Sequence, residues 1–182
     1  MNEQPKPLCT DLDGTLIKGD VTRKAAGIFA KRSFLNIFRM FFWLLRGRAR
    51  FKQKLAESVD PDAASFEYNG VFLEFIRQKK KEGRRIFLAT AANRIHAQKL
   101  ADYLGIFDGV LASTNIVNLR AEAKARALIM LFGENGFAYA GNSEDDVKVW
   151  DKTDECILVS PSKAALKKMQ NKKYLLFEQE KP

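Results

Sequence analysis

Residues 8 to 16 read LCTDLDGTL, an apolar run that ends in two aspartates and a glycine. The apolar run has the character of a buried strand, and Asp11 and Asp13 stand where that strand would end. Carboxylates beside a buried strand are costly unless they have a partner or a role. In an open parallel sheet, ligands bind at the carboxyl ends of the strands. This stretch therefore predicts a sheet protein whose binding site lies directly after its first strand.

Short apolar runs alternate with helical patterns along most of the chain. Strands are expected at 7–12, 84–90, 108–114, 137–143, 154–160 and 174–179, and helices at 72–83, 96–106, 122–136 and 166–170. Gly105 is a plausible stop for the second of these helices. Alternation of this kind is typical of a parallel sheet that is covered by helices on both faces.

A helical segment interrupts this alternation after the first strand. We expect residues 18–79 to form a small helical cap over the strand ends, and residues 1–17 and 80–182 to form the core. The expected fold class is α/β, a Rossmann-like three-layer sandwich with a mainly parallel central sheet. Residues 18 to 54 contain eleven basic residues and one acidic residue, a charge of +10, whereas the whole chain carries +9. The remainder thus sums to −1, and the cap is expected to meet an anionic partner.

The stretch from Phe29 to Phe51 is aromatic and basic at once. On a helix, a narrow stripe would hold Arg32, Asn36, Arg39, Trp43 and Arg46, and apolar residues would cover the rest. The favoured interpretation is that this wide apolar side packs on the core or within the cap. Shallow contact with a membrane or a membrane protein is the alternative, because a basic border attracts anionic lipid. Nucleic acid is not expected, since the aromatic residues lie among aliphatic ones rather than on a stacking platform.

Other features bear on location. Cys9 and Cys156 lie inside expected strands, which indicates reduced core residues in a cytoplasmic protein. The first residues, MNEQPKPLCT, do not resemble a signal peptide. No apolar run reaches the roughly 18 residues of a membrane span. The single histidine, His96, is expected at the surface. The chain is thus expected in the cytoplasm, with peripheral contact at the inner face of the membrane left open by the cap.

Polar residues recur at the ends of the other expected strands. They are Thr90, Ser113 and Thr114, then Asn142, Ser143, Asp145 and Asp146, with Lys124 opening the helix after the third strand. Each alone is an ordinary strand, turn or helix residue. Together at one sheet edge they predict a site for a divalent cation and an anion, and Mg²⁺ prefers oxygen ligands and bound phosphate.

These residues resemble the motifs of the haloacid dehalogenase-like phosphatase superfamily. DLDGTL at 11–16 matches the first motif, Thr90 the second, Lys124 the third, and GNSEDD at 141–146 the fourth. A closer likeness is to the phosphatase-like domain that precedes a UbiA-type polyprenyl transferase in some bacteria. That likeness rests on stretches such as WLLRGRARFKQKLA and YAGNSEDDVKVW.

The resemblance implies a role for each site residue. Asp11 would attack phosphorus to form an aspartyl-phosphate, and Asp13 would protonate the leaving oxygen and then activate water. Thr90 and Lys124 would complete the catalytic set by holding phosphate oxygens. The implied substrate-binding residues are Gly14, Thr15, Ala91 and Asn93, and the implied Mg²⁺ ligands are Asp11, Asp13, Asn142 and Asp146.

The fourth motif departs from the family pattern at one position. It usually begins Gly-Asp, and here it reads Gly141-Asn142. Asp145 fits the shorter form of the motif and Asp146 the longer, and Asp146 is preferred as the metal ligand. The function expected is Mg²⁺-dependent hydrolysis of a small or lipid-linked sugar or prenyl phosphate. The alternative is a catalytically weak module that docks on a membrane prenyltransferase or on the membrane surface.

Overall fold

A six-stranded parallel sheet forms the centre of the protein. The computed structural model describes residues 5–178. The strands run in the order β3-β2-β1-β4-β5-β6, and every neighbouring pair is parallel. They are β1 Leu8–Thr10, β2 Ile86–Asn93, β3 Gly109–Ser113, β4 Ala138–Gly141, β5 Glu155–Val159 and β6 Tyr174–Phe177. The mainly parallel sheet expected from the sequence is confirmed.

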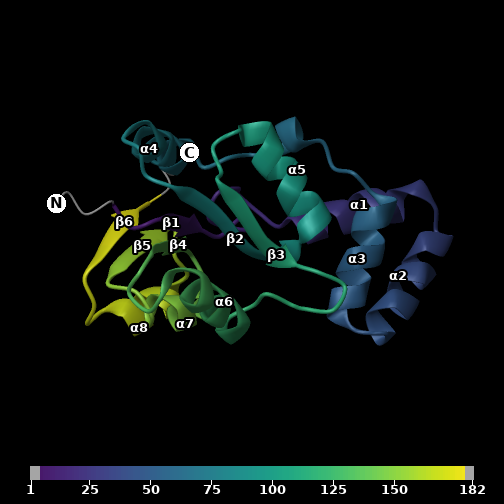
Figure 1. Cartoon of the computed structure of the whole chain (residues 1–182). Helices are drawn as coiled ribbons and strands as arrows, with labels where there is room; N and C mark the ends of the chain where they lie inside the picture. Colours follow the sequence, from purple (N-terminus) through teal and green to yellow (C-terminus); the bar gives the residue numbers. More distant parts are fainter. Residues whose placement is uncertain (1–4, 179–182) are drawn as a thin grey trace.

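Helices cover both faces of this sheet (Figure 1). One apolar layer joins α4, Gly70–Lys81, and α5, Arg94–Leu104, to the strands. The opposite layer joins α6, Glu122–Phe132, α7, Val147–Trp150, and α8, Lys163–Met169. Both layers contain fully buried side chains, such as Phe72 in the first and Trp150 in the second. The expected three-layer sandwich is therefore confirmed.

The strand order places a crevice next to β1. From β1 the chain builds outward through β2 and β3, and it then returns to the other side of β1 to add β4, β5 and β6. Thr10, the last residue of β1, is in register with Leu88 of β2 and Ala140 of β4. Ligand sites of open parallel sheets form at such a reversal, outside the carboxyl ends of the strands. Residues that directly follow β1 and β4 therefore meet at this edge.

The cap consists of three helices between β1 and α4. They are α1 Val21–Arg32, α2 Leu35–Leu45 and α3 Arg48–Ser58, followed by the short 3-10 helix η1 Ala63–Ser65. These helices share a small apolar cluster of their own, centred on Phe29 and Leu55. Figure 1 shows α1, α2 and α3 grouped at one end of the molecule. The sheet and the cap thus have separate apolar interiors.

The packing of α4 bears on the boundary between cap and core. Its buried residues, Phe72, Leu73 and Ile76, belong to the apolar layer on the sheet. The division expected between residues 79 and 80 falls inside this helix, because the sequence shows a helix but not which body it packs on. By its contacts α4 lies with the core.

The apolar side of α2 is exposed, contrary to the favoured interpretation. We name Ile37, Phe38, Phe41, Phe42, Leu44 and Leu45 the outer face of α2, and each is 47–67% exposed. The helix packs inward through its polar stripe instead: Asn36 is buried, and its Nδ2 donates to the carbonyl of Phe29 at 2.9 Å. That carbonyl lies in the last turn of α1, where helix carbonyls lack helical partners. Trp43 stacks on the Phe29 ring with centroids 5.2 Å apart.

Helix ends, the last strand and the two cysteines were also predicted from the sequence. Gly105 does end α5, with a left-handed φ of +64°. Short helices cover 144–150, where GNSEDD taken by itself is typical of an acidic helix start. The last strand ends at Phe177, and Gln179, where it was expected to end, lies outside the described residues. Cys9 and Cys156 are buried free thiols, as expected.

His96 is buried, and its expected place at the surface is wrong. It is 3% exposed, and its Nε2 lies 2.9 Å from the carbonyl of Val59, directly after α3. The imidazole therefore joins α5 to the end of the cap.

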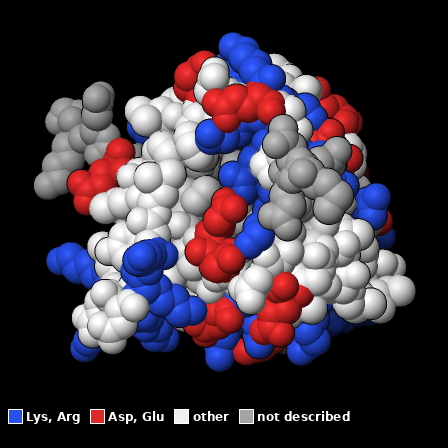
Figure 2. Space-filling view, turned by 60° about the vertical axis from the view of Figure 1, so that its left-hand side comes forward, with Lys and Arg blue, Asp and Glu red and all other residues white. Residues whose placement is uncertain are grey.

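Charge is distributed differently over the two ends of the molecule. Figure 2 brings forward the end opposite the cap, and there both basic and acidic side chains are scattered among uncharged ones. The cap differs, because residues 21 to 56 include no acidic residue at all. No helix among residues 5–178 is long and apolar enough to cross a membrane.

Candidate active site

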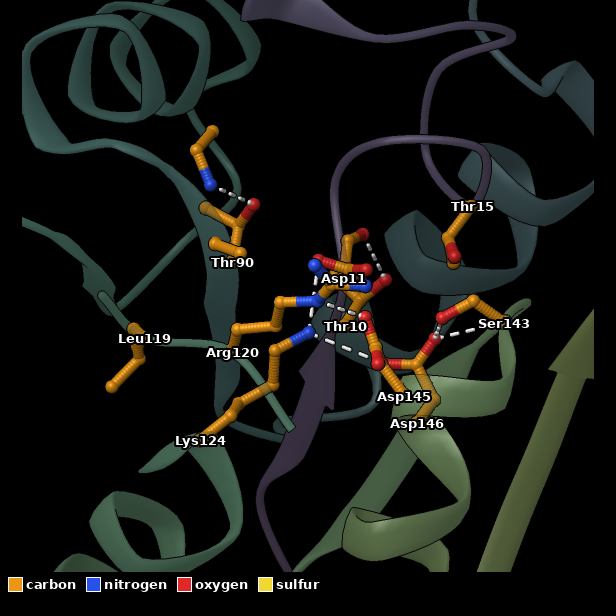
Figure 3. A network of polar contacts seen from close by, with 12 residues as sticks. Thr10, Asp11, Thr15, Thr90, Leu119, Arg120, Lys124, Ser143, Asp145 and Asp146 are labelled. Carbon is orange, nitrogen blue, oxygen red and sulfur yellow. Dashed lines mark hydrogen bonds and ion pairs between the residues drawn. The ribbon is translucent and has the colours of Figure 1, made fainter. Parts of the chain in front are cut away.

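A charged cavity of about 340 Å³ opens at the carboxyl edge of the sheet. Asp11 and Asp13 line it from the loop after β1, and Asn142 and Ser143 from the loop after β4. Three cations and three further carboxylates complete the charged part of its wall: Lys52, Arg120, Lys124, Asp20, Asp145 and Asp146. Figure 3 shows Asp11 at the centre of this group, with Arg120 and Lys124 on one side and Asp145 and Asp146 below. The cavity can thus hold an anion and a cation together.

Asp11 and Lys124 form the floor of the cavity. The Asp11 backbone N–H donates to the carbonyl of Ala140 at 2.9 Å, which fixes the residue between β1 and β4. Lys124 Nζ lies 3.1 Å from Asp11 Oδ1, although that oxygen receives no well-directed hydrogen bond from any described residue. Lys124 is 3% exposed and also donates to the Tyr139 hydroxyl at 2.7 Å. Asp11 thus lines the cavity, and its buried Oδ1 keeps acceptor capacity beside the ammonium of Lys124.

Burial and neighbouring charges shift the pKa values of both Asp11 and Lys124. Burial and the nearby Asp146 raise the pKa of Asp11 to about 6, although Lys124 opposes the shift. Burial alone would lower the pKa of Lys124, but Asp11 and Asp146 hold it above its ordinary value. At neutral pH the pair is therefore an ionised carboxylate beside a cation, which is the form that a carboxylate nucleophile requires.

Asp146 lines the cavity and is also held by a dense set of hydrogen bonds from the protein. Its Oδ1 accepts from Lys124 at 3.2 Å and from the Tyr139 hydroxyl at 2.7 Å. Its Oδ2 accepts from the backbone of Asn142 and from the backbone and hydroxyl of Ser143 at 2.7–3.1 Å. With five donors on two oxygens and 1% exposure, this carboxylate holds Lys124 in place.

Both aspartates line the cavity, and the preference for Asp146 over Asp145 as metal ligand stays a prediction. Asp145 lines the cavity, where it forms an ion pair with Arg120. The sequence spacing admits both aspartates, and only the folded hydrogen bonds distinguish them.

Asp13 has the properties of a proton donor. Burial, with Asp20 and Asp11 nearby, raises the pKa of Asp13 to about 7. Its Oδ1 accepts from the backbone N–H of Val21, the first residue of α1, at 2.8 Å. A carboxyl with a pKa near the working pH can both give and take a proton. The same contact fixes the cap against the loop after β1.

Gly14 and Thr15 contact the side chain of Asn142 and do not line the cavity. Gly14 has a φ of +75°, and a Cβ there would lie 2.2 Å from Asn142 Nδ2, so glycine is required for this close approach. The Thr15 hydroxyl donates to Asn142 Oδ1 at 3.3 Å and is fully buried. Neither of these two expected substrate-binding residues lines the cavity.

The residues at the carboxyl end of β2 also differ in whether they line the cavity. Ala91 lines the cavity, as expected. Thr90 is fully buried, its hydroxyl accepts from the backbone of Ala92 at 3.0 Å, and Figure 3 shows it apart from the group around Asp11. Asn93 caps α5 and donates to Gln53 of α3 at 2.8 Å. Thr90 and Asn93 are buried and are not among the residues that line the cavity.

Three charged residues of the cavity were not predicted from the sequence. Lys52 reaches in from α3 and donates to the carbonyl of Ala91 at 2.7 Å, and burial lowers its pKa. Asp20 caps α1, and Arg120 precedes α6. The basic character of the cap was a signal for Lys52, but nothing in the sequence singles it out from the neighbouring basic residues.

The side chains at the cavity could bind a magnesium ion that takes only a few of its ligands from the protein. No cluster of three or more His, Cys, Asp or Glu residues that could hold a metal occurs within residues 5–178. Mg²⁺, however, commonly keeps several waters and binds one or two carboxylates together with a phosphate. The carboxyls of Asp11 and Asp13 and the amide oxygen of Asn142 are suitable ligands, and Asp145 and Asp146 are further carboxylates at the same cavity.

Known proteins resemble this chain in sequence and in fold. An uncharacterized protein y4nM of Sinorhizobium fredii is 36% identical over 155 residues, which are 84% of this chain and 30% of that protein. The chain thus spans about a third of that relative. A protein of unknown function from Bordetella pertussis superposes with a TM-score of 0.73 at 15% identity, over 98% of this chain and all of the other. A phosphoserine phosphatase in apo form gives 0.64 at 17%, over 98% and 96%.

A family model matches the stretch that contains all four sequence motifs, at 11–16, 90, 124 and 141–146. The haloacid dehalogenase-like hydrolase family matches residues 8–149, which include β1, the cap and every charged residue of the cavity. The chain belongs to the haloacid dehalogenase-like hydrolases.

Proposed function

We propose that the protein is a Mg²⁺-dependent phosphomonoester hydrolase that works through an aspartyl-phosphate. The observation that carries the proposal is the pair of carboxyls at the cavity floor. Asp11 lines the cavity 3.1 Å from Lys124, and Asp13, which lines the same cavity, has a pKa of about 7. One group suits nucleophilic attack and the other suits proton transfer.

The first half-reaction uses both carboxyls. An Asp11 oxygen bonds to phosphorus while the bond from phosphorus to the ester oxygen breaks, and Asp13 gives its proton to that leaving oxygen. In the second half-reaction Asp13 takes a proton from water, whose oxygen attacks phosphorus and releases Asp11 and inorganic phosphate. Lys124, with Lys52 and Arg120, supplies positive charge for the equatorial oxygens. Bound Mg²⁺ would offset the repulsion between the carboxylate and the phosphate.

The substrate class follows from the cavity and the cap. A cavity of about 340 Å³ lined with cations accommodates a phosphate and a small group beside it. We propose a small or lipid-linked phosphate, the latter because the apolar outer face of α2 lies on the same cap as Lys52. Phosphoserine phosphatases are among the solved structures with this fold, which supports a phosphomonoester as substrate.

The test is hydrolysis of an aryl phosphate with and without Mg²⁺. We expect Mg²⁺-dependent turnover that falls by at least about 10³-fold in Asp11→Asn, since the variant lacks the nucleophile. Asp102→Asn, an exposed carboxylate change on α5, is the matched control and should keep full activity. Turnover in Asp11→Asn equal to that of the wild type would refute the proposed mechanism.

A second candidate is a catalytically weak module that docks on a membrane prenyltransferase or on the membrane. The observation that favours it is Asn142, an amide where a carboxylate ligand would bind Mg²⁺ more strongly. Absence of wild-type turnover at every Mg²⁺ concentration, with Asn142→Asp gaining activity, would favour this candidate over the enzyme.

A further inference from the structure

We propose that the outer face of α2 binds the surface of an anionic lipid bilayer. The inference starts from the exposure of this helix. Seven of the eleven residues of α2 are large, apolar and 47–67% exposed, namely Leu35 and the six of the outer face, which include Phe38, Phe41 and Phe42. Soluble proteins seldom leave a contiguous apolar patch of this kind uncovered unless it meets a partner or a membrane. The proposal concerns a surface outside the cavity and does not rest on the proposed catalytic activity.

The orientation of α2 makes the apolar face available as a whole. Asn36 and Trp43 turn inward and bind the last turn of α1, so the apolar residues point away from the cap. Figure 1 shows α2 on the outer side of the cap, away from the sheet. At about 1.5 Å per residue the helix is roughly 16 Å long, enough to lie along an interface but too short to cross a bilayer.

The positive charges around α2 indicate that the surface it binds is anionic. Residues 21 to 56 hold ten basic residues and no acidic one. Arg39 and Arg46 are exposed on α2 itself, seven residues apart and so on the same side of the helix. No acidic side chain among the described residues forms an ion pair with Arg39, Arg46, Arg48 or Arg50. An apolar face with a basic border is the pattern of helices that lie in the headgroup region of anionic membranes.

The same charges argue against a second copy of the chain as the occupant. Two copies joined through this face would bring Arg39 and Arg46 of one copy near those of the other. Like charges placed together at an interface are unfavourable, whereas an anionic bilayer supplies the complementary charge. A bilayer therefore accounts for both the apolar residues and their basic border.

The experiment is co-sedimentation of the full chain with lipid vesicles. The vesicles are phosphatidylcholine alone, or with about one third phosphatidylglycerol to give a negative surface. We expect binding to the anionic vesicles at low ionic strength and its loss as salt is raised to about 0.5 M. Phe38→Ser/Phe41→Ser should lower the partition coefficient by about tenfold or more. Arg39→Gln/Arg46→Gln should lower it on anionic vesicles only.

A matched control shows whether vesicle binding depends on α2 or on exposed apolar residues in general. Ile116→Ser/Met130→Ser removes apolar residues that are 84% and 88% exposed elsewhere on the protein, and it should bind vesicles as the wild type does. Circular dichroism and melting temperature should change little in these variants, because each altered apolar side chain is at least 51% exposed. Absence of wild-type binding to anionic vesicles at low salt would overturn the proposal. So would a wild-type dimer that the Phe38→Ser/Phe41→Ser variant converts to monomer without any vesicle binding.

Discussion

The Asp146 carboxylate shows how one side chain can be assigned by its hydrogen bonds. Replacing it in Asp146→Asn removes the charge that faces Lys124 in a fully buried position. Breaking one partner of a buried ion pair commonly costs about 3–5 kcal/mol, and we expect a loss near the lower end because Asp11 remains beside the lysine. Urea unfolding measures this loss.

Asp145→Asn is the companion variant for this prediction. Asp145 and its partner Arg120 are both exposed in part, so the change should alter stability by less than about 1 kcal/mol. It should instead raise the Mg²⁺ concentration needed for half-maximal activity. If Asp146→Asn raised that concentration and left stability unchanged, Asp146 would be the metal ligand that the sequence spacing favours.

The pH dependence of catalysis follows from the two carboxyls of the cavity floor. Asp11 must be ionised to attack, so with a pKa of about 6 activity should fall below that pH. Asp13 must be protonated to serve the leaving oxygen, so with a pKa of about 7 activity should fall again above that pH. The profile of kcat/KM is therefore a bell with its maximum between these values. A profile that stays flat from neutral to alkaline pH would show that Asp13 is not the proton donor.

Between α5 and the end of α3, His96 makes stability depend on pH. Burial lowers its pKa in the folded protein, so the unfolded chain binds more protons as pH falls through its ordinary value near 6.5. The stability that the neutral imidazole contributes is present above that pH and is lost below it. We expect the free energy of unfolding to decrease less between about pH 7.5 and pH 5.5 in His96→Gln than in the wild type.

The comparison of two proteins is necessary in this experiment. The raised pKa values of Asp11 and Asp13 act with the opposite sign, because the folded state then holds the additional protons. That contribution is common to the wild type and His96→Gln, and it cancels in the difference measured by denaturant unfolding at each pH. Equal pH dependence in the two proteins would mean that the His96 pKa is not lowered on folding.

Elements were predictable from the sequence where a local pattern decides them. The strands and the core helices follow from apolar periodicity, and β1 with its two aspartates fixed the edge on which the site lies. The pattern of α2 also gave its apolar side correctly. It could not show whether another element covers that side, since this depends on where α1 and α3 lie. The favoured packed interpretation was therefore wrong, while the helix itself was expected.

The residues of the cavity were also predictable in part. Asp11, Asp13 and Lys124 lie at strand ends or helix starts, so the order of the elements alone brings them together. Lys52 comes from a cap helix, and its distance to Ala91 is set by the docking of the cap on the core. Sequence patterns report neighbours within an element and the edges of a sheet, but not contacts made by the docking of an inserted segment.

At the scale of the whole molecule, the cap completes the charge of the core's cavity. Lys52 crosses from α3 to the carbonyl of Ala91, and its ammonium lies near Asp13 and Asp20 in the same cavity. In Lys52→Met the apolar stem is kept and the charge is lost, so an anionic substrate should bind more weakly. We expect KM for a phosphomonoester to rise by about tenfold, which corresponds to about 1.4 kcal/mol, with a smaller change in kcat.

Lys54→Met is the matched control, because this lysine lies two residues away on α3 but pairs with Glu57 at the surface. It should leave both kinetic constants unchanged. A fall in kcat with unchanged KM in Lys52→Met would instead place the lysine among the groups that act only in the transition state. An effect of the same size in both variants would mean that the overall positive charge of the cap attracts the substrate. Separation of the two variants would show that the cap supplies one defined charge to the cavity, and that binding therefore depends on how the cap is docked.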